Sequence, residues 1–146
     1  MRANQLSPAP TPFLDSDGAR IGMARTLAVP QEIVGVERLI GLGVPAVREA
    51  GARSDRPLPI FVALPDASRP DMRRENDADR RILSELAARS GVPIDREASR
   101  VFHGEHAAFG EALRYACGWL DGSEGKVEAL VGGIDSAFDA DMLREL

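Results

Sequence analysis

The chain has 146 residues, of which 44% are hydrophobic and 28% are charged, and its net charge is −5 at pH 7. This length suffices for one domain with a buried core, while the acidic balance gives no electrostatic basis for binding nucleic acid or an anionic membrane surface. The N-terminus has no apolar signal region, and no apolar run approaches the roughly 18 residues of a membrane-spanning helix. We therefore expect a cytoplasmic protein with no nucleic-acid or membrane partner.

The N-terminal region divides into an arm and the start of a domain. Three prolines within the first dozen residues predict an irregular arm over residues 1–12, which leaves residues 13–146 as the domain. Residues 20–26 are typical of a short strand or an edge ribbon. From Gln31 to Ala50 the apolar residues recur at spacings of three and four, which predicts a helix that Pro45 should kink or split.

The central region combines a buried strand with a bounded helix. Residues 59–64, PIFVAL, form a short apolar run between prolines, which is typical of a strand buried on both faces of a parallel sheet. A polar loop follows. The next helix is predicted over residues 76–90, with Asn76 as its cap and Gly91 at its end.

The C-terminal half continues the alternation of strands and helices. Residues 99–102 are a short strand candidate, residues 127–133 a second buried strand, and a last helix should begin at about Ala140. The helix between the two strands is predicted to bury one apolar face, made of Phe109, Leu113, Ala116, Cys117 and Leu120. This order predicts an α/β fold with layered helices on a mostly parallel sheet.

The stretch "SRVFHGEHAAFGEAL", residues 99–113, predicts a strand, a tight glycine turn and a helix start. Such an elbow often carries a nucleophile, because the free N–H groups of the helix stabilise an anion. The turn contains neither Cys nor Ser. Glu105 and His106 are the candidate catalytic residues, and His103 and Gly104 are candidates for binding substrate. A simpler interpretation is that Glu105 favours the helix start while both histidines are polar turn residues.

Two further features have a chemical and a structural interpretation. Gly132 and Gly133 follow a predicted strand and are candidates for close approach of a substrate, or they form a tight turn. Cys117, the single cysteine, lies on the predicted apolar face and is expected to be a small buried hydrophobe. The histidines and Glu105 make an incomplete ligand set without H-E-x-x-H spacing, so we expect no metal and no cofactor.

The segment "GEHAAFGEALRYACGWLDGSEGKVEALVGGIDS", residues 104–136, resembles the central part of the β-ketoacyl synthases of the thiolase-like superfamily. Upstream, "PIFVALPD", "VPAVREA" and the helix at 76–90 resemble the N-terminal half of that family. The resemblance implies one half of a thiolase-like fold and an acyltransferase of fatty acid or polyketide synthesis. As partners it implies a second copy or a ketosynthase-like chain, and an acyl carrier protein.

The chain departs from the family at the position of its nucleophile. The attacking cysteine should fall between Phe102 and His106, where this sequence has none. The histidine pair and lysine of the family come from a C-terminal half that this sequence does not contain. We therefore expect a structural or partner-binding member without condensing activity. One alternative is an active 3-oxoacyl synthase-type acyltransferase whose other half lies outside this chain, and another is a small metal-binding domain using His103 and His106.

Overall fold

A three-stranded parallel sheet lies at the centre of the protein. The computed structural model describes residues 8–24, 28–73, 75–124 and 127–137. Strand β3 (Ile60–Leu64) is the middle strand and pairs with β4 (Arg100–His103) on one side and β5 (Leu130–Gly133) on the other. Every residue of β3 is buried, which confirms the strand predicted from the apolar run.

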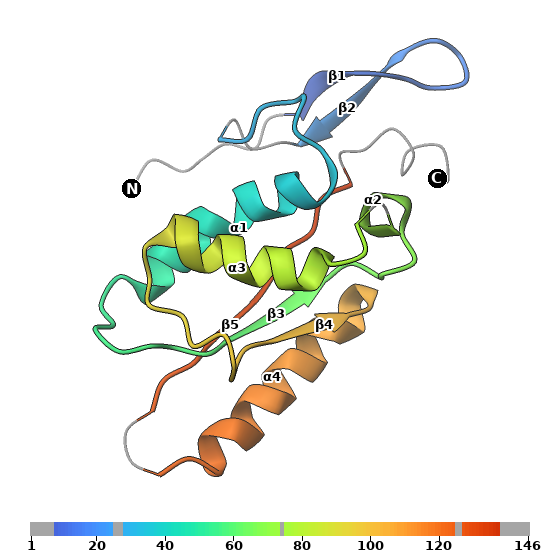
Figure 1. Ribbon diagram of the computed structural model, residues 1–146. Helices are drawn as coiled ribbons and strands as arrows, with labels where there is room; N and C mark the ends of the chain where they lie inside the picture. The colour runs from blue at the N-terminus through green and yellow to red at the C-terminus, as the bar shows by residue number, and fades with distance from the viewer. Residues whose placement is uncertain (1–7, 25–27, 74, 125–126, 138–146) are drawn as a thin grey trace.

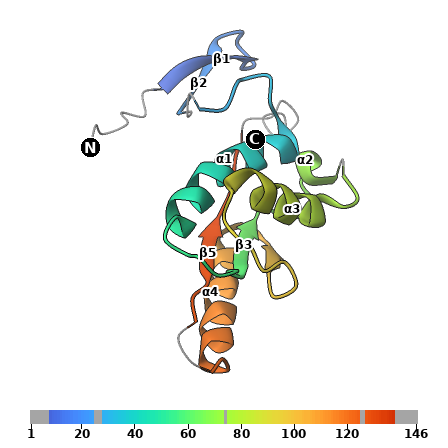
Figure 2. The ribbon, with the colours of Figure 1, turned by 60° about the vertical axis from the view of Figure 1, so that its left-hand side comes forward.

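Helices cover both faces of this sheet. Helices α1 (Gly35–Gly51) and α3 (Ala78–Ser90) lie on one face, and α4 (Glu105–Asp121) lies on the other (Figures 1 and 2). The one-turn helix α2 (Pro70–Arg73) forms within the loop that the sequence predicted after β3. This layered α/β arrangement with a parallel sheet confirms the predicted fold class at that level.

A separate antiparallel hairpin precedes the layers. Strand β1 (Pro8–Leu14) pairs with β2 (Arg20–Ala24), and the two join no other strand of the described chain. The ribbon predicted at residues 20–26 is confirmed over Arg20–Ala24. The part of the predicted extended arm from Pro8 onward belongs to strand β1. A two-stranded ribbon tolerates prolines because each strand has one edge that needs no N–H donor.

Helix α1 runs without a break through Pro45, contrary to the predicted split. Pro45 lies on the exposed side of the helix, while Leu39, Ile40, Val44 and Val47 are buried on the opposite side. These apolar residues, on both sides of the proline, belong to one core cluster, which favours a continuous helix. Pro45 has no backbone N–H, so one helical hydrogen bond is missing on this exposed side of α1.

Helix α3 starts and ends with different kinds of signal. Its N-cap is Asp77, with no side-chain capping hydrogen bond, so the predicted cap at Asn76 was wrong. Its C-cap is Gly91, as predicted, in the left-handed conformation with φ of 74°. Glycine adopts this conformation without strain, which explains a clean helix end at this position.

The buried face of α4 is not the one that the sequence predicted. Ala108, Ala112 and Ala116 are buried and pack the helix against Phe61 of β3, assisted by the partly buried rings of Tyr115 and Trp119. Ala116 belongs to the predicted face and is buried, but the other predicted core residues lie outside this contact: Phe109 is 46%, Leu113 47% and Leu120 37% exposed, and Cys117 is exposed as well. The alanines allow close approach, and the aromatic rings fill the remaining volume.

Of the last two predicted elements, the strand lies within the described residues and the helix does not. Strand β5 begins at Leu130 instead of residue 127, and its residues are partly exposed because it forms one edge of the sheet. The helix expected from about Ala140 lies outside the described residues. The described chain therefore ends, at residue 137, just beyond the carboxyl end of β5.

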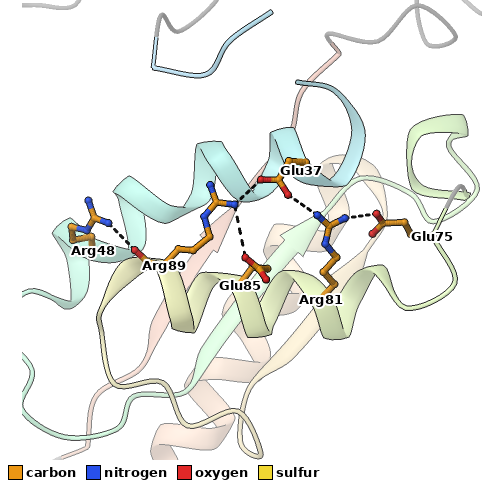
Figure 3. A network of polar contacts seen from close by, with 6 residues as sticks. All are labelled: Glu37, Arg48, Glu75, Arg81, Glu85 and Arg89. Atoms are coloured by element: carbon orange, nitrogen blue, oxygen red, sulfur yellow. Dashed lines mark hydrogen bonds and ion pairs between the residues drawn. The ribbon is translucent and has the colours of Figure 1, made fainter. Parts of the chain in front are cut away.

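Charged side chains tie α1 to α3 along the surface of their contact (Figure 3). The Glu37 carboxylate of α1 accepts hydrogen bonds from Arg81, at 2.5 Å, and from Arg89, at 2.6 Å. Arg81 also pairs with Glu75, and Arg48 of α1 donates to the Arg89 carbonyl at 2.7 Å. These contacts hold α3 beside α1, and the first turn of α3 contributes to the candidate site.

Candidate functional site at the carboxyl edge of the sheet

The connections of the sheet place its candidate site at the carboxyl ends of the strands. The chain passes from the central strand β3 through α3 to β4, and then through α4 on the opposite face to β5 on the other side of β3. The strand order thus reverses between β3 and β5. In open α/β sheets, ligands bind in the crevice outside the carboxyl ends of the strands at such a reversal.

His103 is the last residue of β4 and lies at this edge, opposite Leu64 of β3. Its ring Nδ1 lies 2.8 Å from the Pro65 carbonyl oxygen, and its Nε2 lies 2.7 Å from Oδ1 of Asp79 in the first turn of α3. The His103 side chain is 24% exposed and that of Asp79 is 51% exposed. Both ring nitrogens are therefore occupied by oxygen acceptors, and neither is directed at open space as a general base requires.

The loop after β3 contributes a carboxylate close to His103. Oδ1 of Asp66 accepts a hydrogen bond from the Ser68 backbone N–H at 2.7 Å. The hydrogen bond from the Ser68 side chain is the largest cause that lowers the pKa of Asp66, followed by this backbone contact, with smaller contributions from His103 and Arg73. A hollow of about 450 Å³ opens beside this loop, between α2, the first turn of α3 and His103.

A second set of contacts joins the loops after β3 and β5. Arg69 pairs with Asp135 at 2.7 Å and donates to the Ser136 carbonyl at 2.8 Å. Arg38, a buried arginine of α1, donates to the Ser136 hydroxyl at 2.9 Å. These bonds hold the chain across the point where the strand order reverses.

The predicted elbow is present in its backbone. β4 passes through Gly104, the N-cap of α4, into the helix. Gly104 has φ of 130°, which residues other than glycine rarely adopt. As a glycine, it caps α4 without a side-chain hydrogen bond. Glu105 and His106 are the first two residues of α4, but their side chains lie outside the described part of the structure, so their catalytic roles stay predictions.

The two glycines of β5 lie apart from His103. Gly132 pairs with Val62 and Gly133 with Ala63, on the side of β3 that faces away from β4. A Cβ atom on Gly133 would meet Ala63 and Phe109 at an ordinary 3.9 Å, and one on Gly132 would meet nothing within 4 Å. Neither glycine is required for close packing. All six candidate residues thus lie at or near one edge of the sheet, but the central strand separates the two groups.

The residues that hold His103 were not identified from the sequence. Asp79 was placed in the first turn of a helix but is 24 positions from His103, and the Pro65 carbonyl carries no side-chain signal at all. Arg69 is likewise 66 positions from its partner Asp135. The only available signal was topological, since residues that follow parallel strands share one edge of the sheet.

The described part of the chain contains neither a cluster of metal ligands nor a membrane-spanning helix. No group of three or more His, Cys, Asp or Glu side chains gathers there in a way that would hold a metal ion. Among the described helices, none combines the length and apolar character needed to cross a membrane.

Comparison of the chain with protein-family models, with curated protein sequences and with solved structures found no match.

Proposed function

We propose that this protein is a β-ketoacyl synthase-like protein that does not condense acyl chains and instead has a structural or partner-binding role. The observation that carries the proposal is the β4–α4 elbow, where the chain has the backbone path of a nucleophile turn and the sequence His-Gly-Glu-His. An acyl-enzyme intermediate at this turn requires a thiol or hydroxyl, and the turn has neither.

The position of the single thiol supports the absence of condensation. Cys117 lies roughly three turns into α4 and is exposed on the helix surface, away from the elbow. His103 likewise has both ring nitrogens within hydrogen-bonding distance of acceptors. Neither side chain has the arrangement of an activated nucleophile and its base.

Uncovered apolar surface supports the partner-binding role. Phe109, Leu113 and Leu120 are exposed on α4, and strand β5 forms an open edge of the sheet among the described residues. The backbone N–H groups of Leu130 and Ile134 donate to the Pro59 and Ala63 carbonyls of the β3 segment at 2.9 Å. Because successive residues of a strand direct their backbone groups to opposite sides, those of Val131 and Gly133 face the open side. Apolar side chains next to an open strand edge are typical of a surface that another chain covers.

Catalysis is tested by incubating the protein with acyl- and malonyl-thioesters of coenzyme A and of an acyl carrier protein. We expect no condensed product and no covalent acyl adduct by intact-protein mass spectrometry. The Cys117→Ala variant is the control, because an exposed thiol can be acylated without catalysis. A condensed product, or an adduct that persists in Cys117→Ala, contradicts the proposal.

Partner binding is tested by sedimentation of the protein alone and with a candidate ketosynthase chain or acyl carrier protein. Leu113→Gln should weaken any complex formed through α4. Ala107→Gln, at another exposed position on the same helix, is the matched control. Equal effects of the two substitutions would exclude the apolar surface of α4 as the binding surface.

A further inference from the structure

The exposed side of α4 has the residue spacing of a helix that packs along another helix. Among the described helices, α4 alone covers its face of the sheet, whereas α1 and α3 share the other face (Figures 1 and 2). Gly110, Leu113, Cys117 and Leu120 are all exposed and recur at spacings of three and four residues. Residues with this spacing lie on one side of a helix, where they can contact a second helix along its length. We call these four residues the α4 seam.

We propose that a second copy of the same chain covers the α4 seam, packed antiparallel so that two α4 helices meet across a two-fold axis. The inference rests on the partner-binding role proposed above and names the partner. A two-fold axis uses the same residues on both sides of the contact, so the seam has to be complementary to itself. Its shape and its flanking charges both meet this requirement.

The shape of the seam is self-complementary when the axis passes at the level of Tyr115. Residues equally far before and after that position then lie opposite each other, so Leu120 faces Gly110 of the second copy and Leu113 faces Cys117 of the second copy. A Cβ atom at Gly110 would meet nothing within 4 Å in its own chain. Glycine inside a helix lowers helix stability relative to alanine. The packing of a single chain does not require this glycine, whereas the pair uses the space that it leaves for a leucine.

Two opposite charges lie next to the seam on the same flank of α4. Arg114 and Asp121 are about two turns apart and both exposed. Neither side chain forms a hydrogen bond or an ion pair with the part of the chain that the structure describes. Helical side chains incline toward the N-terminus of their own helix, so in the antiparallel pair Arg114 inclines toward Asp121 of the second copy. Symmetry forms this ion pair twice, and such charges set both the partner and its orientation.

The pair should form only in concentrated protein. One pair of helices makes a small contact, so we expect a dissociation constant on the order of 10 µM. In dilute protein the monomer predominates and Cys117 is exposed. In the dimer Leu113 of the second copy covers this thiol, so its reaction with a thiol reagent should slow about tenfold as protein concentration rises through the dissociation constant.

Charge reversal tests the pairing by sedimentation of the full chain over about 1 µM to 1 mM. Arg114→Glu and Asp121→Arg each bring like charges together at both ion pairs, so each variant alone should dimerise about tenfold more weakly than the parent protein. An equal mixture of the two variants should recover the parent affinity, because both ion pairs of the mixed dimer join opposite charges. Glu111→Arg, an exposed position of α4 away from the seam, is the matched control and should dimerise like the parent.

Three results would overturn the second copy as the partner: a parent protein that stays monomeric throughout, single variants that dimerise as well as the parent, or a mixture no better than its components. The thiol measurement needs no variant, and a Cys117 rate that does not fall with concentration also overturns the proposal. A monomeric protein that binds a ketosynthase chain or an acyl carrier protein, and loses that binding in Leu113→Gln, overturns only this inference. A condensed product contradicts the proposed function and leaves the measured dimerisation unchanged.

Discussion

Gly51, the last residue of α1, packs against Val92 so closely that a Cβ atom at position 51 would lie 2.5 Å from one methyl group of Val92 and 2.8 Å from the other. Val92 directly follows Gly91, the C-cap of α3. The absence of a side chain at Gly51 thus lets the C-terminal end of α1 meet the C-terminal end of α3. Val92 is buried and β-branched, so its methyl groups have little room to move.

Gly51→Ala should therefore destabilise the protein by about 1–3 kcal/mol, since overpacking outweighs the gain in helix propensity. Chemical denaturation measures the free energy of unfolding. Adding Val92→Ala should reduce the cost of Gly51→Ala, which a double-mutant cycle detects. Gly110→Ala on α4 is the matched control. An added Cβ at this position meets no neighbouring atom within 4 Å, so we expect the free energy of unfolding to rise by about 0.5–1 kcal/mol. A Gly51→Ala variant whose free energy of unfolding equals or exceeds that of the parent protein would contradict this packing.

Replacing Glu37 should weaken the contact between α1 and α3. Glu37→Gln keeps the shape of the side chain but removes the charge that pairs with Arg81 and Arg89. These three side chains are 38–42% exposed, so solvent screening limits the loss of stability to about 1 kcal/mol at low salt, and less at about 1 M salt. Denaturation with urea at both salt concentrations measures this loss of stability. Glu49→Gln, an exposed position on the same helix, should change stability less. Equal losses at the two positions would argue against the network.

Ser68→Ala should raise the pKa of Asp66 toward its ordinary value, because the Ser68 side chain is the largest cause that lowers it. The backbone N–H of residue 68 remains, so the return is partial. A lowered native-state pKa stabilises the fold above the unfolded-state pKa, and this contribution is lost as pH falls through the native value. Titration of the Asp66 carboxyl carbon by NMR measures the change. Ser68→Thr retains the hydroxyl and is the control, and an unchanged pKa in Ser68→Ala would contradict the assignment.

The sequence predicted those elements whose signal is local. Strand β3 follows from an uninterrupted apolar run, and the end of α3 follows from Gly91. The buried face of α4 was not predicted correctly. Ala108, Ala112 and Ala116 recur at the same helical spacing as Phe109 and Leu113, shifted by one residue, so the spacing alone does not distinguish the two faces. Only the distance between the helix and the sheet selects the stripe of alanines, and that distance is a tertiary property.

The backbone of the elbow was predicted from the sequence, whereas the contacts of His103 were not. The elbow after β4 was recognised from a glycine between a strand and a helix, and the structure places Gly104 there at a positive φ. The partners of His103 come from the loop after β3 and from α3. These contacts depend on strand order, which a single sequence does not encode in any local pattern.

The last prediction concerns the exposed side of α4, which carries Leu113 and Cys117. In the folded protein, Cys117 should react with a thiol reagent such as dithionitrobenzoate at a rate within about tenfold of that in denaturant, since its thiol is exposed and the reagent can reach it. Leu113→Gln should cost less than about 0.5 kcal/mol because that side chain is 47% exposed. Ala112→Gln, one position away and fully buried against Phe61, should cost several times more. A protected thiol together with a costly Leu113→Gln would show that α4 buries the stripe first predicted from the sequence.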